Sequence, residues 1–183
     1  MMCYRQKFSA ILLVFLLSLS LGAVAYADDN EFTEAEILHI AKITNQFEVE
    51  FAELALQRTD NDEVHQVANM MIRDHNEIIE ELEELIGDME ETPRESEFSE
   101  ELENQAREVI SELGNAVGPQ FDEIYITNEV EYHQQLLDLI NEELLAETDD
   151  RELSAFLTNM TSELNAHLTF IQRMKPQILD DED

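Results

Sequence analysis

The sequence predicts an all-α protein, a bundle of four long helices in which two helical hairpins are joined by a long crossover that contains a short helix. Two observations predict this fold class. Apolar residues recur at spacings of three and four along most of the chain after residue 33, which is the period of an amphipathic helix. Turn and capping signals divide that pattern into four long segments, with one long interruption in the middle.

The first 27 residues have the pattern of an export signal. Arg5 and Lys7 give a positive start, Phe8 to Leu21 form an apolar run, and Ala25-Tyr26-Ala27 is a small-x-small cleavage site. The apolar run is shorter than the roughly 20 residues that a membrane-spanning helix needs. We therefore predict a cleaved signal peptide over residues 1–27, with an uncleaved anchor as the alternative, and no transmembrane anchor after cleavage.

The cysteine content restricts the chemistry of the exported chain. Cys3 is the only cysteine, and it precedes the apolar run, whereas a lipoprotein would need it at the cleavage point. Removing residues 1–27 leaves no thiol. Disulfides, cysteine nucleophiles, iron-sulfur clusters and cysteine-ligated zinc are therefore excluded.

The chain is strongly acidic, with 43 Asp and Glu against 10 Lys and Arg and a formal charge of −33. Loss of Arg5 and Lys7 with the signal peptide changes that charge to −35. Such a charge repels phosphate, so we predict no nucleic acid partner and no anionic lipid partner. Cations are possible partners, and the alternative interpretation is that the acidity serves solubility.

The first hairpin is predicted over residues 34–58 and 62–86. Thr33 with Glu36 forms a capping box ahead of the first helix. Gly87 is the expected terminator of the second. The apolar positions expected to face the core are Ile37, Ile40, Ala41, Phe47, Phe51, Leu54 and Ala55, then Val64, Val67, Ala68, Met71, Ile78, Ile79, Leu82 and Leu85.

A crossover follows up to Pro119, with a short helix expected over 99–113. It is far longer than the roughly two to eight residues of a tight helix connection, so it is expected to run the length of the molecule. The second hairpin is predicted over 120–146 and 150–174, and an acidic disordered tail over 175–183. Two hairpins flanking one long crossover are the connectivity of ferritin-like bundles, so we predict one such domain over 28–174.

Three of the five histidines interrupt the apolar stripes, each on a different predicted helix. His75 lies on the second, His133 on the third and His167 on the fourth. An imidazole is costly to bury without a partner, which suggests a buried polar network or a metal site. Glu48 lies beside the stripe of the first helix. Imidazole and carboxylate together suit a transition metal ion such as Fe, Zn or Cu, so these four residues are the predicted ligand set.

Counting from the tight turns brings the candidates of each hairpin to within about one helical turn of a common level. The crossover conceals the register between the hairpins. Glu129 and Glu163 each precede a histidine by four residues, which places them on the same helix face as secondary ligand candidates. Asp74 and Tyr125 are candidate hydrogen-bond partners of the histidines. In the alternative interpretation, Glu48, Asp74 or Tyr125 satisfies the histidines and no metal binds.

The di-iron pattern usual in this architecture is Glu-x-x-His on two helices. Here the residues three positions before the histidines are Ile72, Val130 and Leu164. We therefore predict no dinuclear oxygen chemistry, and we do not expect an enzyme.

Four runs in series resemble the exported, ferritin-like family of unknown function that is often labelled "predicted outer membrane protein" (domain of unknown function 4142). The runs are residues 48–55, 67–75, 121–133 and 164–168. Tyr132 replaces the Asp that the family usually has before the third-helix histidine, and the Pro often found in its last helix is replaced near Ser162. The resemblance implies the fold and an envelope location, and it implies no reaction.

The sequence thus predicts a periplasmic, ferritin-like helical bundle of unknown biochemical role that binds a metal ion through His and Glu in its core. The alternative is a non-catalytic envelope or stress-related interaction protein whose histidines organise the core. A third possibility is a pH-sensing bundle, because buried neutral imidazoles that gain charge near pH 6 would loosen it.

Overall fold

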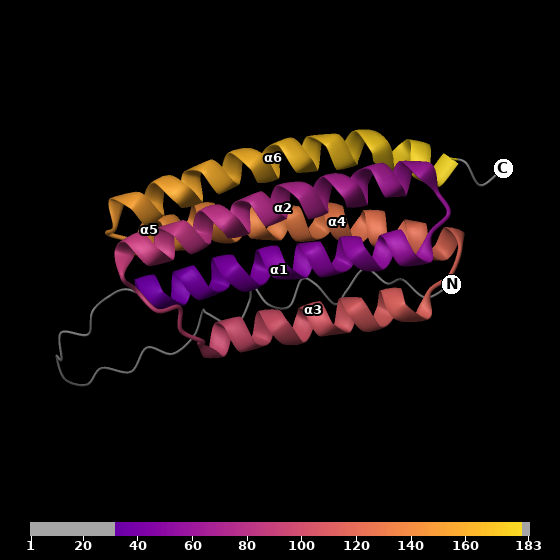
Figure 1. The fold of residues 1–183 in the computed structure, drawn as a ribbon. Helices are drawn as coiled ribbons and strands as arrows, with labels where there is room; N and C mark the ends of the chain where they lie inside the picture. The colour runs from indigo at the N-terminus through magenta and orange to yellow at the C-terminus, as the bar shows by residue number, and fades with distance from the viewer. Residues whose placement is uncertain (1–31, 181–183) are drawn as a thin grey trace, which may run out of the picture.

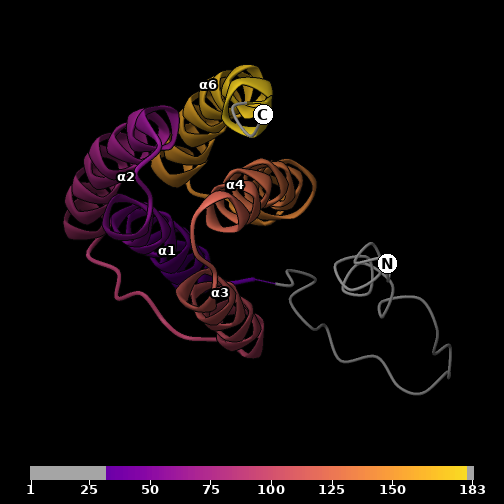
Figure 2. The same ribbon diagram turned by 90° about the vertical axis from the view of Figure 1, so that its right-hand side faces the viewer.

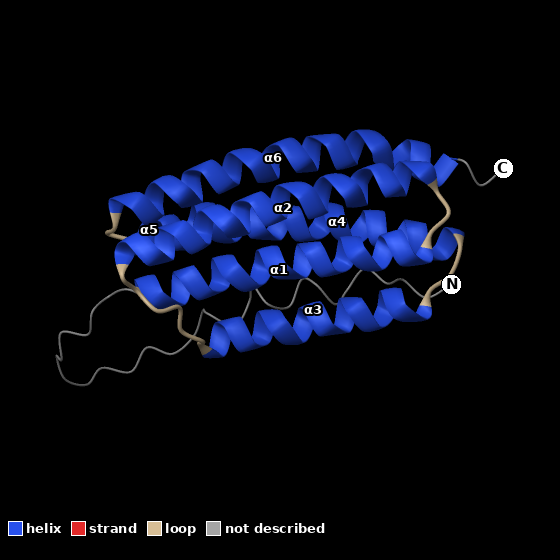
Figure 3. Cartoon of the chain, in the orientation of Figure 1, coloured by secondary structure: helices blue, strands red, loops and turns tan. Residues whose placement is uncertain are grey.

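A computed structural model describes residues 32–180, and within this range every regular element is helical (Figures 1 and 3). The predicted signal peptide and residues 181–183 lie outside the described residues. The prediction of an all-α fold is confirmed. The elements are α1 (Glu34–Arg58), α2 (Asp62–Met89), α3 (Glu97–Asn115), α4 (Pro119–Leu139), the π-helical turn η2 (Ile140–Leu144), α5 (Leu145–Glu147) and α6 (Arg151–Asp180).

The four long helices α1, α2, α4 and α6 form the bundle, and α3 lies outside it along α1 (Figure 2). Because α3 carries the chain back along the length of the molecule, α2 and α4 run in the same direction, as the predicted ferritin-like connectivity requires. No helix among residues 32–180 combines the length and apolar character needed to cross a membrane.

Side-chain caps define the starts of α1 and of the crossover helix α3. The Thr33 hydroxyl and the Glu36 carboxylate form the predicted capping box of α1, with the Thr33 backbone N–H donating to Glu36 Oε2 at 2.9 Å. Ser96 and Ser99 form a second capping box, so α3 begins earlier and is longer than the predicted short helix. Arg58 ties the other end of α3 to α1 by donating to the Gly114 carbonyl at 2.8 Å.

Two helix ends differ from the sequence-based expectation. Gly87 does not terminate α2, which continues to Met89 and ends at Glu90 in the left-handed region (φ 54°). Ile86 and Met89 pack against the core, and this packing outweighs the low helix propensity of glycine. The predicted helix over 120–146 contains the wider turn η2, which keeps Ile140 buried as expected.

The prediction of a disordered tail from residue 175 is wrong for residues 175–180, which continue α6 through Pro176. Proline removes one backbone hydrogen bond, but the carbonyl it frees belongs to the exposed Gln172 and faces water. Ile178 is 2% exposed and packs in the core beside Met174. Burial of this apolar side chain stabilises the last turn despite the proline.

Shortening Ile178 tests this extension of α6. Ile178→Val is expected to lower the free energy of unfolding by about 1 kcal/mol, because it removes one buried methyl group. The exposed neighbour Gln177 provides the control, since Gln177→Ala should change stability by less than about 0.5 kcal/mol. Urea denaturation curves measure both. Equal stability of Ile178→Val and the parent protein would mean that the last turn does not pack.

The apolar core is divided into two clusters, one toward each end of the bundle. Most predicted inward positions fall in these clusters, from Ile37 in one to Phe51 in the other. Ile79 is half-buried and belongs to neither cluster. Between them the bundle is filled by buried polar side chains from all four long helices. This polar layer comprises Thr44, Asn45 and Glu48 of α1, His75 of α2, Glu129 and His133 of α4, and His167 of α6.

Candidate metal centre

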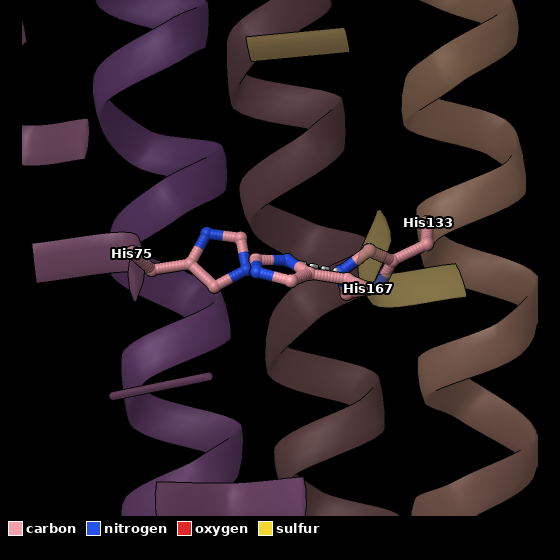
Figure 4. Close-up of side chains that lie close together, drawn as sticks. All are labelled: His75, His133 and His167. Atoms are coloured by element: carbon pink, nitrogen blue, oxygen red, sulfur yellow. Dashed lines mark hydrogen bonds between the residues drawn. The ribbon is translucent and has the colours of Figure 1, made fainter. Parts of the chain in front are cut away.

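Three imidazole rings from three helices converge within the polar layer (Figure 4). The ring centroids of His75, His133 and His167 form a nearly equilateral triangle with sides of 5.1, 5.5 and 5.7 Å. One ring nitrogen of each histidine lies within 4.8 Å of those of the other two. The three side chains are at most 3% exposed. The tertiary structure therefore brings together the three histidines that the sequence placed on separate stripes.

The remaining nitrogen of each ring is bound to an oxygen acceptor. Nδ1 of His75 lies 2.8 Å from Asn45 Oδ1, and Nδ1 of His133 lies 2.9 Å from the Glu129 carbonyl. Nε2 of His167 lies 3.2 Å from Asp74 Oδ2. The Asn45 amide nitrogen donates to the Ala41 carbonyl at 2.7 Å, so its oxygen is free to accept. Each outer nitrogen is thus the donor, which assigns the tautomer of each neutral ring.

These tautomers direct three lone pairs toward one another. The inward atoms are Nε2 of His75, Nε2 of His133 and Nδ1 of His167, and the last two lie 3.4 Å apart. Two lone pairs at that distance repel unless a proton or a cation lies between them. Nitrogens bound to one tetrahedral metal ion at about 2.0–2.1 Å are about 3.4 Å apart, so this pair already has the spacing of a metal site.

Glu48 supplies an oxygen next to the histidine triangle. Its Oε2 lies 3.9 Å from Nε2 of His75, and its Oε1 lies 3.8 Å from Nδ1 of His133. Glu129 approaches the same side of His133, with Oε2 at 3.7 Å from Nδ1. Both carboxyl groups are fully buried, and their four oxygens have no hydrogen-bond partner among the described residues. Glu48 therefore lies next to His75 and His133 and groups with Glu129, while the three histidines form a group of their own. Its role as the fourth ligand stays a prediction.

Burial controls the ionisation of the three histidines. Desolvation lowers the pKa of His133 to about 3, with a further contribution from His167. Desolvation and the neighbouring imidazoles hold the pKa of His75 well below its usual value, and desolvation lowers the pKa of His167 although Asp74 opposes the shift. All three rings are neutral at pH 7, the form that binds metal. In the folded state each of them therefore gains its charge at a lower pH than an ordinary imidazole does.

The two buried carboxyl groups have raised pKa values. Desolvation raises the pKa of Glu129 to about 7, with opposing contributions from Glu48 and Tyr125. Desolvation and the neighbouring Glu129 raise the pKa of Glu48 well above its usual value. Burial therefore favours the protonated, neutral form of Glu48 in the metal-free protein. A metal ion that used its carboxylate would displace that proton.

Asp74 joins the histidine triangle to the surface of the bundle. Burial acts to raise its pKa, but hydrogen bonds from Arg73 and His167 outweigh that effect and hold the pKa below its usual value. Arg73 donates from both Nε and Nη2, the latter at 2.9 Å from Oδ2. Asp74 is thus an ionised acceptor that orients His167, which agrees with its predicted role as a partner of a histidine.

The remaining predicted residues fall in different places. Glu163 is exposed and lies apart from the residues that converge, because it points outward from α6 while His167 points inward. Tyr125 is fully buried, and its hydroxyl is close enough to Glu129 to influence ionisation. Its hydroxyl makes no hydrogen bond with the described residues, so it does not satisfy a histidine as the alternative interpretation proposed.

Sequence reasoning missed Asn45, which orients His75. The available signal was position: Asn45 lies one helical turn before Glu48, on the apolar stripe of its helix. Tyr132 also packs within reach of the site, edge-on against Phe51 and with its hydroxyl 3.4 Å from the Thr44 carbonyl.

The family described as "Domain of unknown function (DUF4142)" matches residues 21–174, most of the chain. The chain belongs to the DUF4142 family. This confirms the resemblance found in the sequence runs, three of which contain a histidine of the triangle. The family description names no reaction for the DUF4142 fold.

A solved structure described as a secreted DUF305 protein from Streptomyces coelicolor is similar in fold to this DUF4142 chain. The TM-score is 0.64 at 12% sequence identity, and the match covers 79% of this chain and 91% of that chain. At this identity the similarity supports the ferritin-like helical fold alone. No curated protein matches the sequence significantly.

Proposed function

We propose that this protein binds a single transition metal ion inside its helical bundle, through His75, His133, His167 and Glu48. The observation that carries the proposal is the orientation of the three rings. Each has its outer nitrogen tied to an oxygen and its inner nitrogen directed at a common point. Metal-binding histidines in proteins are oriented by such oxygen acceptors.

The donor set favours ions of the zinc, copper and ferrous type. Three imidazoles and one carboxylate suit these borderline metals, whereas magnesium and calcium prefer sites made of oxygen alone. A site with four protein ligands has no position for water or substrate. With Glu48 as the fourth ligand, the proposed role is binding of the ion without catalysis.

Export to the periplasm is the location that we propose for this function. The pattern of residues 1–27 supports it, as does the description of the structurally similar DUF305 protein as secreted. A thiol-free, histidine-rich site suits an oxidising compartment, where a cysteine site would be vulnerable.

Metal content measured on purified protein tests the proposal. After loading with Zn²⁺ and dialysis, elemental analysis is expected to find one zinc per chain. His167→Gln is expected to weaken binding by roughly 100-fold or more, since loss of an orienting partner alone commonly costs about 10- to 100-fold. Titration calorimetry measures the affinity.

His65→Gln is the matched control, because His65 lies outside the polar layer with its Nε2 3.0 Å from the Thr59 carbonyl. It should bind zinc like the parent protein. Equal, substoichiometric zinc in the parent, the His167 variant and the His65 variant would contradict the proposal. That result would favour the alternative in which the histidines only organise the core.

A further inference from the structure

The proposed metal site lies deep in the bundle, so an ion needs a route to it. His75 and His133 are fully buried, and their outer partners Asn45 and Glu129 are fully buried as well. The hydrogen bonds from His75 to Asn45 and from His133 to Glu129 therefore do not lead to the protein surface. The His167 side chain is the least buried of the three at 3% exposed, and its partner Asp74 is 20% exposed. Among the described ligands and their partners, the contact from His167 to Asp74 leads outward.

Asp74 lies in the wall of a surface cavity between α2 and α6. The cavity has a volume of about 530 Å³. Its charged lining is four carboxylates and one guanidinium, from Asp74, Glu77, Glu81, Glu163 and Arg73. The excess of negative charge attracts cations, and a concave site concentrates that field. The three histidines are absent from the lining, so this cavity is separate from the metal site and joined to it through Asp74.

Arg73 lies between the surface cavity and the proposed metal site, where it binds Asp74. It holds both oxygens of Asp74, and Asp74 Oδ2 also accepts from His167. The Arg73 side chain is 64% exposed, so it can swing into solvent without disturbing the core. While it stays in place, its positive charge opposes the approach of a metal ion to Asp74.

We infer that the cavity between α2 and α6 is the entrance for divalent metal ions, and that the Arg73–Asp74 pair restricts passage from it to His167. This inference rests on the proposed function and adds the route by which that site is filled. Hydrated cations collect among Glu77, Glu81 and Glu163. An ion that replaces Arg73 at Asp74 reaches the histidine triangle past the ring of His167.

Stopped-flow association of Zn²⁺ with metal-free protein at moderate salt tests the route. Glu77→Gln combined with Glu163→Gln is expected to slow association by roughly tenfold, because two charges that attract the ion are removed at its point of entry. Arg73→Gln is expected to accelerate association by about threefold or more, since it removes an opposing charge and releases Asp74. In both variants the equilibrium affinity should change less than the rate.

A matched control removes two exposed carboxylates from α3, on the far side of α1 from this cavity (Figure 2). Glu100→Gln combined with Glu108→Gln changes the net charge by the same amount and should change the association rate by less than about twofold at moderate salt. Circular dichroism verifies that all variants are folded, and their altered residues lie at the surface.

The outcomes separate this inference from the proposed function. Opposite changes in rate for the glutamate and arginine variants, with little change in the α3 control, support the entrance. If zinc binds with parental rates in every variant, or if the control slows association as much as the cavity variant, the entrance is wrong while the metal site stands. If the parent protein binds no zinc, both the metal site and its entrance are wrong.

Discussion

Zinc is expected to stabilise this protein strongly. At a free Zn²⁺ concentration 1,000 times the dissociation constant, the free energy of unfolding should rise by about 4 kcal/mol, because the unfolded chain does not hold three histidines together. For a domain of this size the midpoint of thermal unfolding should rise by roughly 10 °C. Thermal unfolding followed by circular dichroism, with and without Zn²⁺, measures the effect.

Two comparisons show whether the gain comes from the histidine triangle. His167→Gln should lose most of the zinc-dependent stabilisation, since it removes one ligand nitrogen. Mg²⁺ at the same concentration should give a much smaller effect, because it prefers oxygen ligands and retains its water. Equal stabilisation of the parent and the variant, or by Mg²⁺ and Zn²⁺, would locate the binding on the acidic surface instead.

Replacement of Glu129 by glutamine is expected to alter how stability depends on pH. The pKa of Glu129 is raised to about 7 in the folded protein, against an ordinary value of 4.5. A raised pKa means that the folded state holds the proton more tightly than the unfolded state. The contribution of Glu129 is therefore present below pH 4.5 and is lost as the pH rises through 7.

The glutamine in Glu129→Gln does not titrate. The variant therefore does not lose this contribution to its stability as the pH rises. The stability of the variant relative to the parent should rise by about 2.5 kcal/mol between pH 5 and pH 8. His133 acts in the opposite direction: its lowered pKa gives a contribution that is present above pH 6.5 and lost as the pH falls toward 3. The histidine contribution is common to both proteins, so it largely cancels in the difference.

Urea denaturation at several pH values, with a chelator present, measures this difference. The exposed Glu131 on the same helix provides the control, and Glu131→Gln should follow the parent at each pH. Parallel pH curves for Glu129→Gln and the parent would show that Glu129 ionises as an ordinary surface carboxyl does, which would contradict its role in a buried carboxyl pair.

The individual helices of this bundle could be predicted because their signals are local. The capping box of Thr33 and Glu36 and the inward positions of the first hairpin, such as Ile37 and Leu82, depend on spacing within one helix. The errors occurred where packing outweighed a local preference. Pro176 did not end α6, because Ile178 is buried beyond it, and Gly87 did not end α2.

In the candidate site, too, local signals predicted some features and tertiary packing decided others. Spacing along the chain singled out three histidines, because each interrupts an apolar stripe, and Glu48, because it lies beside one. The spacing of four residues before a histidine also suggested both Glu129 and Glu163 as ligands. The structure buries only one of them. Glu129 is fully buried beside His133, whereas Glu163 is exposed in the wall of the cavity.

Helical periodicity thus indicates which side chains face inward, since each position depends only on the rotation of about 100° per residue within its own helix. The level at which helices from different hairpins meet is set by long-range packing of the two apolar clusters above and below the polar layer. That register decides that His75 meets His133 and His167, and that Asn45 and Asp74 hold the outer nitrogens. No local signal spans the crossover, so only the folded bundle turns three separate histidines into one site.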